Sequence, residues 1–365
     1  MRLMLLVAFA FSLSCTPAPL KNTTTEVSLV AAVSSIPVLQ VEKLIVTPNA
    51  DGHRDFISAI LNAKKSVYLK MFHLTNDEVV EALIQAKKKG VEVKVILDRK
   101  SMLLSRFSDP YKKLLDNQVS VLKSTKKFSI THEKSMTVDH TVALITAINL
   151  TKNYKTTRDF GIITKDAAVV AEVESVFQAD WQNATDKKGI TPNLTNPFLI
   201  WSPVNSREKI VALIEFAKRS IDLEVENFGN ADIQQALVVA AKKGIHVRVL
   251  VPLCDKNFNP FHNVKYIQQM ESEKIHTRVM PSPSTEKVPY MHSKMILVDG
   301  QAMYIGSVNF SNNSTQKARE LGLIFSNDKV AKQISEIYEL DWNIATALPE
   351  KRSRIQCVKD MKGVL

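Results

Sequence analysis

The sequence predicts an α/β protein built from two similar halves, and three observations support this prediction. A strand–helix–strand pattern occurs twice, with Gly90 and Gly244 at equivalent positions 154 residues apart. A His-x-Lys-x4-Asp motif also occurs twice, starting at His132 and at His292. Finally, 45% hydrophobic and 23% charged residues in a chain of 365 are ordinary for a globular protein with a substantial core. This composition excludes a disordered chain, a collagen and a small disulfide scaffold.

The strand–helix–strand units cover residues 66–97 and 220–251. In each, apolar residues first alternate, as in a strand, and then recur at three- and four-residue spacing, as in a helix. A Lys-Lys-Gly sequence ends each helix, and a second strand rich in Val and Ile follows. Such units build parallel or mixed sheets with helices on their faces.

The second part of each half repeats at a slightly longer distance. Residues 132–139 match residues 292–299, and Asn149 matches Asn309, both 160 residues apart. Residues 158–162 match residues 319–323, and residues 180–181 match residues 341–342, both 161 apart. Loop insertions explain the drift from 154 to 161. We therefore expect a first half at residues 41–190 and a second half at 191–350, followed by a tail at 351–365.

The first residues predict an export signal rather than part of the fold. Arg2 precedes an apolar run from Leu3 to Leu13, which is too short for a bilayer-spanning helix of about 20 residues. The end of the run, at Ser14-Cys15, resembles a lipoprotein signal of bacteria, although Ser12 stands where Leu is usual. We expect residues 1–14 to be removed, Cys15 to carry lipid, and residues 15–40 to form a tether. The protein would then be a membrane-anchored lipoprotein in the periplasm or on the cell surface, or else secreted.

The two remaining cysteines predict no particular site. Neither Cys254 nor Cys357 belongs to a CxxC or metal-binding pattern, so we expect two unpaired thiols, although an oxidising compartment would allow them to pair.

The 48 Lys and Arg residues exceed the 37 Asp and Glu residues, which gives a net charge of +11. This excess indicates an anionic partner, such as a phosphate, a nucleic acid or an acidic membrane surface.

The repeated motifs indicate which residues form the reactive site. Side chains two apart on a strand share a face, so His132 lies beside Lys134, and His292 beside Lys294. Two such strands around a pseudo-two-fold axis would bring together two imidazoles, two ammonium groups and two Asn amides. This set suits a phosphodiester, because one His can attack phosphorus while the other protonates the departing oxygen. The lysines would stabilise the transition-state charge, so no metal or other cofactor is expected.

The doubled motif, with Gly306-Ser307-x-Asn309 after the second copy, resembles the phospholipase D superfamily over about residues 45–345. The resemblance implies a pseudo-dimer of mixed sheets flanked by helices, with one active site between them and a phosphohistidine intermediate. It also implies a monomer, because both halves lie in one chain.

The resemblance also implies a role for each site residue. His132 would be the nucleophile and His292 the general acid and base. Asp139 and Asp299 complete the catalytic motifs, and we expect them to hold the motif loops. The residues expected to bind the phosphate or to orient a histidine are Lys134, Lys294, Asn149, Asn309, Ser307, Asp159 and Glu320.

Three interpretations of the function remain open. The first is hydrolysis of phospholipid headgroups or their transfer to an alcohol. The second is a non-specific nuclease, favoured by the net charge and by the basic run at residues 123–127. The third is an inactive protein that binds anionic surfaces, because the first motif departs from the pattern: His140 replaces Gly300, Thr146-Ala147 replaces Gly306-Ser307, and Asp159 is shorter than Glu320.

Overall fold

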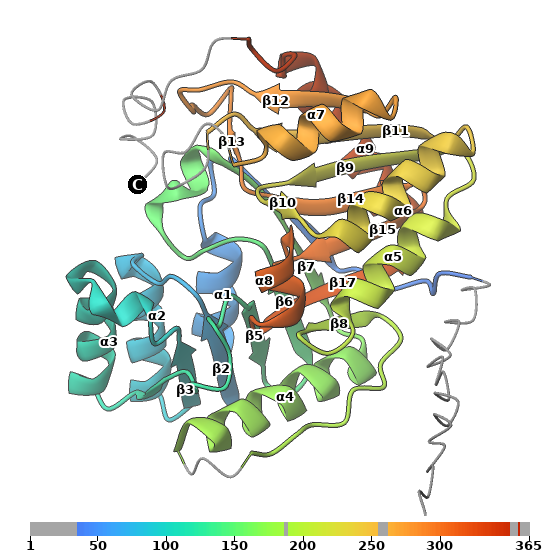
Figure 1. Ribbon diagram of the computed structural model, residues 1–365. Helices are drawn as coiled ribbons and strands as arrows, with labels where there is room; N and C mark the ends of the chain where they lie inside the picture. The colour runs from blue at the N-terminus through green and yellow to red at the C-terminus, as the bar shows by residue number, and fades with distance from the viewer. Residues whose placement is uncertain (1–34, 186–188, 255–261, 351–356, 358–365) are drawn as a thin grey trace, which may run out of the picture. The chain divides into compact units, whose positions relative to one another are not determined.

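The computed structural model describes residues 35–185, 189–254, 262–350 and 357, all within one unit, Val33–Leu365 (Figure 1). The signal at residues 1–14 and Cys15 lie outside the described residues, as does most of the tail. No helix in the described part of the chain is long and apolar enough to cross a bilayer.

Two mixed sheets form the framework, and their strands follow the same spatial order. The first sheet runs β1-β7-β6-β5-β2-β3-β4 and the second runs β8-β17-β15-β14-β9-β11-β12. Along both of these strand orders, the last three strands are parallel to one another and the other neighbouring pairs are antiparallel. The predicted duplication and mixed α/β fold are therefore confirmed.

The strands have the following bounds. In the first sheet they are β1 (Lys43–Thr47), β2 (Ser66–Met71), β3 (Glu92–Leu97), β4 (Ser120–Lys123), β5 (Lys134–Val138), β6 (Val142–Thr146) and β7 (Thr157–Thr164). In the second they are β8 (Leu199–Ser202), β9 (Ser220–Val225), β11 (His246–Pro252), β12 (His276–Met280), β14 (Lys294–Val298), β15 (Ala302–Gly306) and β17 (Glu320–Ser326). Three short strands are β10 (Phe228–Gly229), β13 (Tyr290–Met291) and β16 (Phe310–Ser311).

Helices pack on the faces of both sheets, and one long helix of each half packs into the core that joins the halves. Those of the first half are α1 (Arg54–Asn62), α2 (Asp77–Lys88), α3 (Ser105–Asp116) and α4 (Ala167–Thr185), with 3₁₀ turns at Ser101–Leu103 and Lys152–Lys155. Those of the second half are α5 (Ser206–Phe216), α6 (Ala231–Lys242), α7 (Val264–Ser272), α8 (Asn312–Gln316) and α9 (Asp328–Ile344).

Local sequence explains the equivalent helices α2 and α6. Asn76 caps α2 by accepting a hydrogen bond from the Val79 N–H at 3.0 Å, and Asn230 caps α6 in the same way through Ile233. Each helix is followed by a glycine with positive φ, 88° at Gly90 and 86° at Gly244, a conformation that favours glycine. The predicted Lys-Lys-Gly ends are thus helix C-termini.

Three hydrophobic clusters hold the molecule together. The helices α1, α2 and α3 pack on one face of the first sheet, and α5, α6 and α7 pack on one face of the second. The third cluster joins the halves, because apolar residues of β6 and β7 pack against those of β14, β15 and β17. Figure 1 shows β6, β7 and β17 close together where the halves meet. This shared core fixes the strands that carry the motifs.

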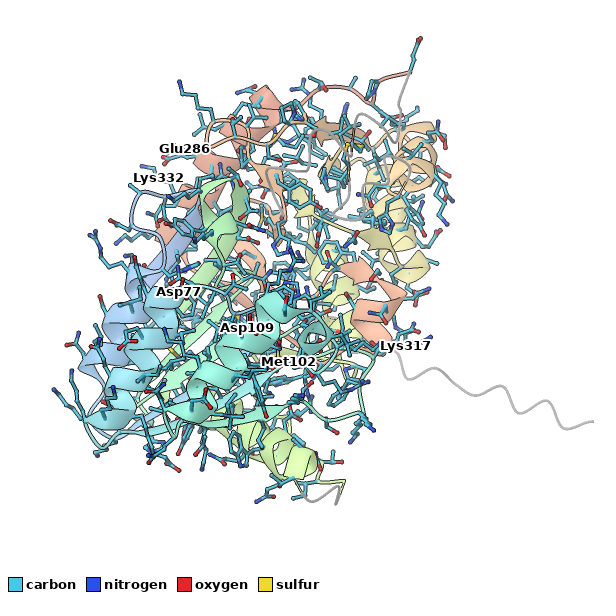
Figure 2. The ribbon with its side chains drawn as sticks, turned by 90° about the vertical axis from the view of Figure 1, so that its left-hand side faces the viewer. Asp77, Met102, Asp109, Glu286, Lys317 and Lys332 are labelled. Carbon is cyan, nitrogen blue, oxygen red and sulfur yellow. A yellow bond between two sulfur atoms is a disulfide. The ribbon has the colours of Figure 1, made fainter. Side chains whose placement is uncertain are left out.

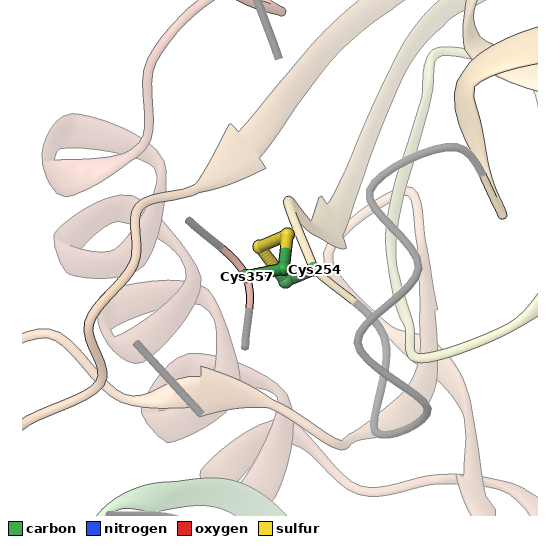
Figure 3. Close-up of a disulfide and its surroundings, with 2 residues drawn as sticks. All are labelled: Cys254 and Cys357. Atoms are coloured by element: carbon green, nitrogen blue, oxygen red, sulfur yellow. A yellow bond between two sulfur atoms is a disulfide. The ribbon is translucent and has the colours of Figure 1, made fainter. Parts of the chain in front are cut away.

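A disulfide joins Cys254 to Cys357 (Figure 3), so the expectation of two unpaired thiols is wrong. The sulfur atoms are 1.97 Å apart and the Cα atoms 5.6 Å apart, across 103 residues of sequence. Both cysteines are buried beside Tyr290. No local pattern predicts this pairing, since only the tertiary fold brings residue 357 back to the end of β11.

Candidate active site

Each histidine motif is paired through its backbone with a strand of the other half. The N–H groups of His132 and Glu133 both donate to the carbonyl of Arg319, at 2.9 and 3.0 Å. Equivalently, β13 pairs with β7, and the N–H of His292 donates to the carbonyl of Arg158 at 3.2 Å. The residue that follows each arginine therefore lies next to the histidine of the opposite half.

Those following residues are the two predicted carboxylates. His132 Nδ1 is 2.8 Å from Glu320 Oε2, and His292 Nδ1 is 2.7 Å from Asp159 Oδ1. A carboxylate at Nδ1 places a proton there and directs Nε2 toward other chemistry. The orienting groups were predicted, but the sequence did not show that each acts on the histidine of the other half.

The lysines lie where the alternation of strand side chains predicts. Lys134 and Lys294 begin β5 and β14, and both side chains are almost completely buried. Lys134 Nζ donates to the carbonyl of His132 at 2.6 Å, and Lys294 Nζ donates to that of His292. The two ammonium groups are thus held beside their own histidines.

Glu226 is a site residue that sequence reasoning missed. Its side chain is fully buried, and Oε2 lies 3.1 Å from Lys294 Nζ and 3.7 Å from His292 Nε2. The hydroxyl of Tyr290 donates to the other carboxylate oxygen at 3.2 Å. His292 therefore has a carboxylate near each of its ring nitrogens.

The first half has an aromatic residue at the matching position. Phe72 lies 154 residues before Glu226, and its ring centroid is 4.6 Å from that of His132. Lys134 Nζ lies 5.1 Å from the same ring. The two histidines thus have different surroundings, and the only sequence signal was this Phe-to-Glu difference between the repeats.

A cavity of about 410 Å³ opens onto His292. The rings of Phe72, His73 and Phe107 stack along it, with centroid separations of 3.8 and 4.1 Å. This aromatic wall was also missed, because Phe72 and His73 follow β2 whereas Phe107 belongs to α3. The residues that line the cavity include Phe72, His73, Arg106, Phe107, Asn149, Tyr154, Asp159, Glu226, Tyr290 and His292.

The predicted amide and hydroxyl groups differ in their surroundings. Asn149 lines the cavity, and its Oδ1 has no hydrogen-bond partner within the described residues. Asn309 is buried, and its Oδ1 accepts from the Asn227 N–H at 3.0 Å. The Ser307 hydroxyl is bonded to the main chain of Leu321 in β17, beside Glu320. Asn149 is thus the residue of the three best placed to reach a ligand.

Asp139 and Asp299 have the same structural role in the two halves. Asp139 accepts hydrogen bonds from the N–H groups of residues 64–66, and Asp299 from those of residues 218–220. Both lie in turns with positive φ, at 52° and 54°. Although we counted them with the catalytic motifs, their carboxylates hold the loop that enters β2 or β9.

Burial changes the acidity of Glu320. Its side chain is completely buried, and this raises the pKa of its carboxyl to about 7, even though Lys134 and Lys294 oppose the shift. The carboxyl next to His132 therefore titrates near neutral pH.

Within the described residues, no group of three or more His, Cys, Asp or Glu side chains is placed to hold a metal ion.

Sequence comparisons identify a family and several relatives. The family described as "Cardiolipin synthase, PLD-like domain" matches residues 56–181 and 210–342, one match in each half. Phospholipase D Z of Dictyostelium discoideum is 22% identical, over 82% of this chain and 87% of its own length. The cardiolipin synthase of a Geobacillus species (strain WCH70) is also 22% identical, over 82% of this chain and 66% of its own length.

Comparisons of structure agree with this fold. The phosphatidylserine synthase of Haemophilus influenzae superposes with a TM-score of 0.68 at 14% identity, over 90% of this chain and 95% of that one. The polyphosphate kinase of Porphyromonas gingivalis superposes with a TM-score of 0.62 at 16% identity, over 90% of this chain and 51% of that one. At these identities the similarity concerns the fold alone.

Proposed function

Because the chain belongs to the phospholipase D superfamily, we propose that this enzyme cleaves or exchanges phospholipid headgroups through a phosphohistidine on His132. The observation that carries the proposal is the pair of histidines, each held at Nδ1 by a carboxylate from the opposite half. The names of the relatives, phospholipase D and cardiolipin synthase, favour a phospholipid as the phosphodiester.

The first step forms the covalent intermediate. Nε2 of His132 attacks phosphorus, the P–N bond forms, and the bond from phosphorus to the headgroup or lipid alcohol breaks. Nε2 of His292 gives its proton to the departing oxygen. In the second step, neutral His292 takes a proton from water or an alcohol, whose oxygen attacks phosphorus and releases His132. Water gives hydrolysis, and an alcohol gives transfer.

The different surroundings of the two histidines support this assignment of roles. Glu226 Oε2 lies 3.7 Å from His292 Nε2, so the histidine assigned as the general acid has a carboxylate beside the ring nitrogen that would transfer the proton. His132 packs against the ring of Phe72 instead, with the two ring centroids 4.6 Å apart. An unprotonated Nε2 is the form that attacks phosphorus.

The charge of the transferring phosphoryl group is balanced by this chain's own side chains. Lys134 and Lys294 supply two positive charges, while Asn149 and Asn309 supply amide donors for the non-bridging oxygens. We infer a reaction that needs no metal ion. Since one chain supplies both motifs, we also infer an active monomer.

Export as a lipoprotein remains part of the proposal. The disulfide between Cys254 and Cys357 supports it, because disulfides persist in oxidising compartments outside the cytosol. Substitution Cys15→Ser tests the anchor: the protein should move from the membrane fraction to the soluble fraction. An unchanged membrane fraction would contradict lipidation at this residue.

The activity test compares phospholipids with nucleic acids. The purified full chain is incubated in EDTA with detergent-dispersed phosphatidylglycerol and phosphatidylethanolamine and, separately, with DNA and RNA. We expect release or exchange of headgroups that is lost in His132→Asn and His292→Asn. The exposed His276→Asn serves as a matched control and should retain activity. Strand cleavage without headgroup release would identify a nuclease instead, and no reaction with either would indicate a binding protein.

A second test separates the roles of the histidines. A p-nitrophenyl phosphodiester has a leaving group that needs no proton, so the first step no longer requires a general acid. His292→Asn should then release about one p-nitrophenolate per protein in a burst and retain phosphate on His132. His132→Asn should give no burst. The reverse result would exchange the two assignments.

A further inference from the structure

The segment between β3 and α3 exposes two consecutive leucines. Leu103 is 85% exposed and Leu104 is 52% exposed, at the end of the 3₁₀ turn and directly before α3. Single exposed apolar residues are common on proteins, as at Val204 and Leu340 here. Two adjacent ones at the entrance to a helix form an apolar tip.

Positive side chains lie in the same segment as this tip and in the loop bonded to it. Arg99 and Lys100 precede it, and Lys126 and Lys127 lie in the neighbouring loop after β4. The Arg99 N–H donates to the Ser124 hydroxyl at 3.2 Å, which holds the two loops together. None of these four cations forms an ion pair with another described residue. The docking surface, as we name it, consists of Leu103, Leu104 and these four cations.

The docking surface continues into the wall of the catalytic cavity. Arg106 and Phe107 lie in the first turn of α3, two and three residues after Leu104, and both line the cavity that opens onto His292. Figure 2 looks onto α3 from this side and labels Met102 at its entrance and Asp109 along it. A flat substrate layer that touched the leucines would therefore lie beside the cavity.

We propose that the docking surface binds an anionic phospholipid bilayer, with Leu103 and Leu104 inserted into it and the four cations on its phosphates. Apolar side chains within a basic surface are typical of segments that lie in the membrane interface. A nucleic acid would use the cations but would leave the leucines in water. The inference rests on the proposed function only for its substrate, since docking itself needs no catalysis.

Vesicle binding tests the docking surface. All residues of the three main hydrophobic clusters lie within residues 33–365, so this part is used, without the apolar N-terminal segment, after circular dichroism confirms its fold. Sedimentation is measured with vesicles of phosphatidylglycerol and phosphatidylcholine. The double substitution Leu103→Ser, Leu104→Ser should weaken binding at least about tenfold, because two leucines lose their burial. The matched control, Leu340→Ser, should bind as the unsubstituted protein does.

Charge and turnover provide the other two readouts. Lys126→Glu with Lys127→Glu, or an increase in salt, should weaken binding to anionic vesicles. Hydrolysis of the water-soluble p-nitrophenyl diester should be unchanged in the leucine variant, while hydrolysis of vesicle lipid should fall with binding.

The outcomes distinguish this inference from the proposed function. Equal binding by the leucine variant, or an equal loss in Leu340→Ser, overturns the docking surface even if the enzyme is active. Loss of binding in the leucine variant without any turnover by the unsubstituted protein supports docking and contradicts the proposed function.

Discussion

Glu320 combines burial with an orienting contact to His132 at 2.8 Å. Burial raises the pKa of its carboxyl to about 7, so the charge that holds the Nδ1 proton of His132 is present above this pH and lost below it. The first half has Asp159 in the equivalent role toward His292. The protonation of Glu320 should therefore affect how the reaction depends on pH.

The first prediction concerns the pH dependence of this group. The rate constant kcat should fall as the pH drops below about 7, because protonated Glu320 no longer accepts the Nδ1 proton. Glu320→Gln should lower kcat by about 10²- to 10⁴-fold and abolish that part of the profile. The control Glu174→Gln, in an exposed pair with His140, should leave the profile unchanged. If kcat of Glu320→Gln still fell as the pH dropped below about 7, this fall would belong to another group.

Glu224 shows that equivalent positions in the repeats carry different charges. It occupies the place of Lys70, is completely buried, and has a pKa raised well above the usual value by burial and by Asp341. The folded protein therefore holds a proton on Glu224 at pH values where the unfolded chain releases it.

The second prediction follows from that difference in proton binding. The free energy of unfolding should decrease as the pH rises from about 4.5 toward the raised pKa of Glu224. Glu224→Gln should remove this decrease and add about 1–3 kcal/mol near pH 8. Urea unfolding from pH 5 to pH 8 measures both effects. An unchanged dependence on pH in the variant would mean that Glu224 is ionised in the fold.

Among the elements, α4 and α9 connect the halves through charge. Asp180 of α4 accepts from Arg319 at 2.8 Å and from Lys70 at 2.7 Å, and Asp341 of α9 accepts from Arg158. Burial alone would raise the pKa of Asp180, but Lys70 and Arg319 hold it below its usual value. These arginines also provide the carbonyls that pair with the histidine motifs. The helices thereby support the strands that position the active site.

The third prediction removes one of these charges. Asp180→Asn should destabilise the protein by about 3–5 kcal/mol, because it leaves Lys70 and Arg319 buried without full compensation. It should also lower kcat, because the Arg319 backbone supports His132. The control Glu42→Gln removes an exposed ion pair with Lys165 and should cost less than about 1 kcal/mol. A similar small cost for both variants would show that the buried network contributes little.

At the scale of the whole molecule, the disulfide joins β11 to a residue near the end of the chain. The two cysteines are 103 positions apart in sequence, and the loop between them includes most of the second half and its motif. A crosslink across such a long loop restricts the unfolded chain more than the folded protein. We therefore expect the disulfide to affect stability more than it affects the geometry of the site.

The fourth prediction tests this crosslink. Reduction with dithiothreitol, or the substitution Cys357→Ser, should lower the free energy of unfolding by about 2–5 kcal/mol. Urea unfolding is measured with and without the reductant. The double variant Cys254→Ser, Cys357→Ser should be insensitive to the reductant, whereas a stability that never changes would contradict the crosslink.

Local patterns were enough to predict much of this protein. The strand–helix–strand units that end in the strands after Gly90 and Gly244, and the shared face of His132 and Lys134, depend on residues near one another in sequence. The orienting role of Asp159 and Glu320 was implied by the resemblance to the phospholipase D superfamily. Periodicity, helix ends and motif spacing report such relations because backbone geometry is regular over short distances.

Tertiary structure decided the rest. In the fold, the carboxylate of each half orients the histidine of the other half. Glu226 lies beside His292, whereas Phe72 lies beside His132. The fold also joins Cys254 to Cys357. These contacts join residues from 60 to 188 positions apart in the chain. No local pattern encodes them, because they follow from the packing of two complete sheets against each other.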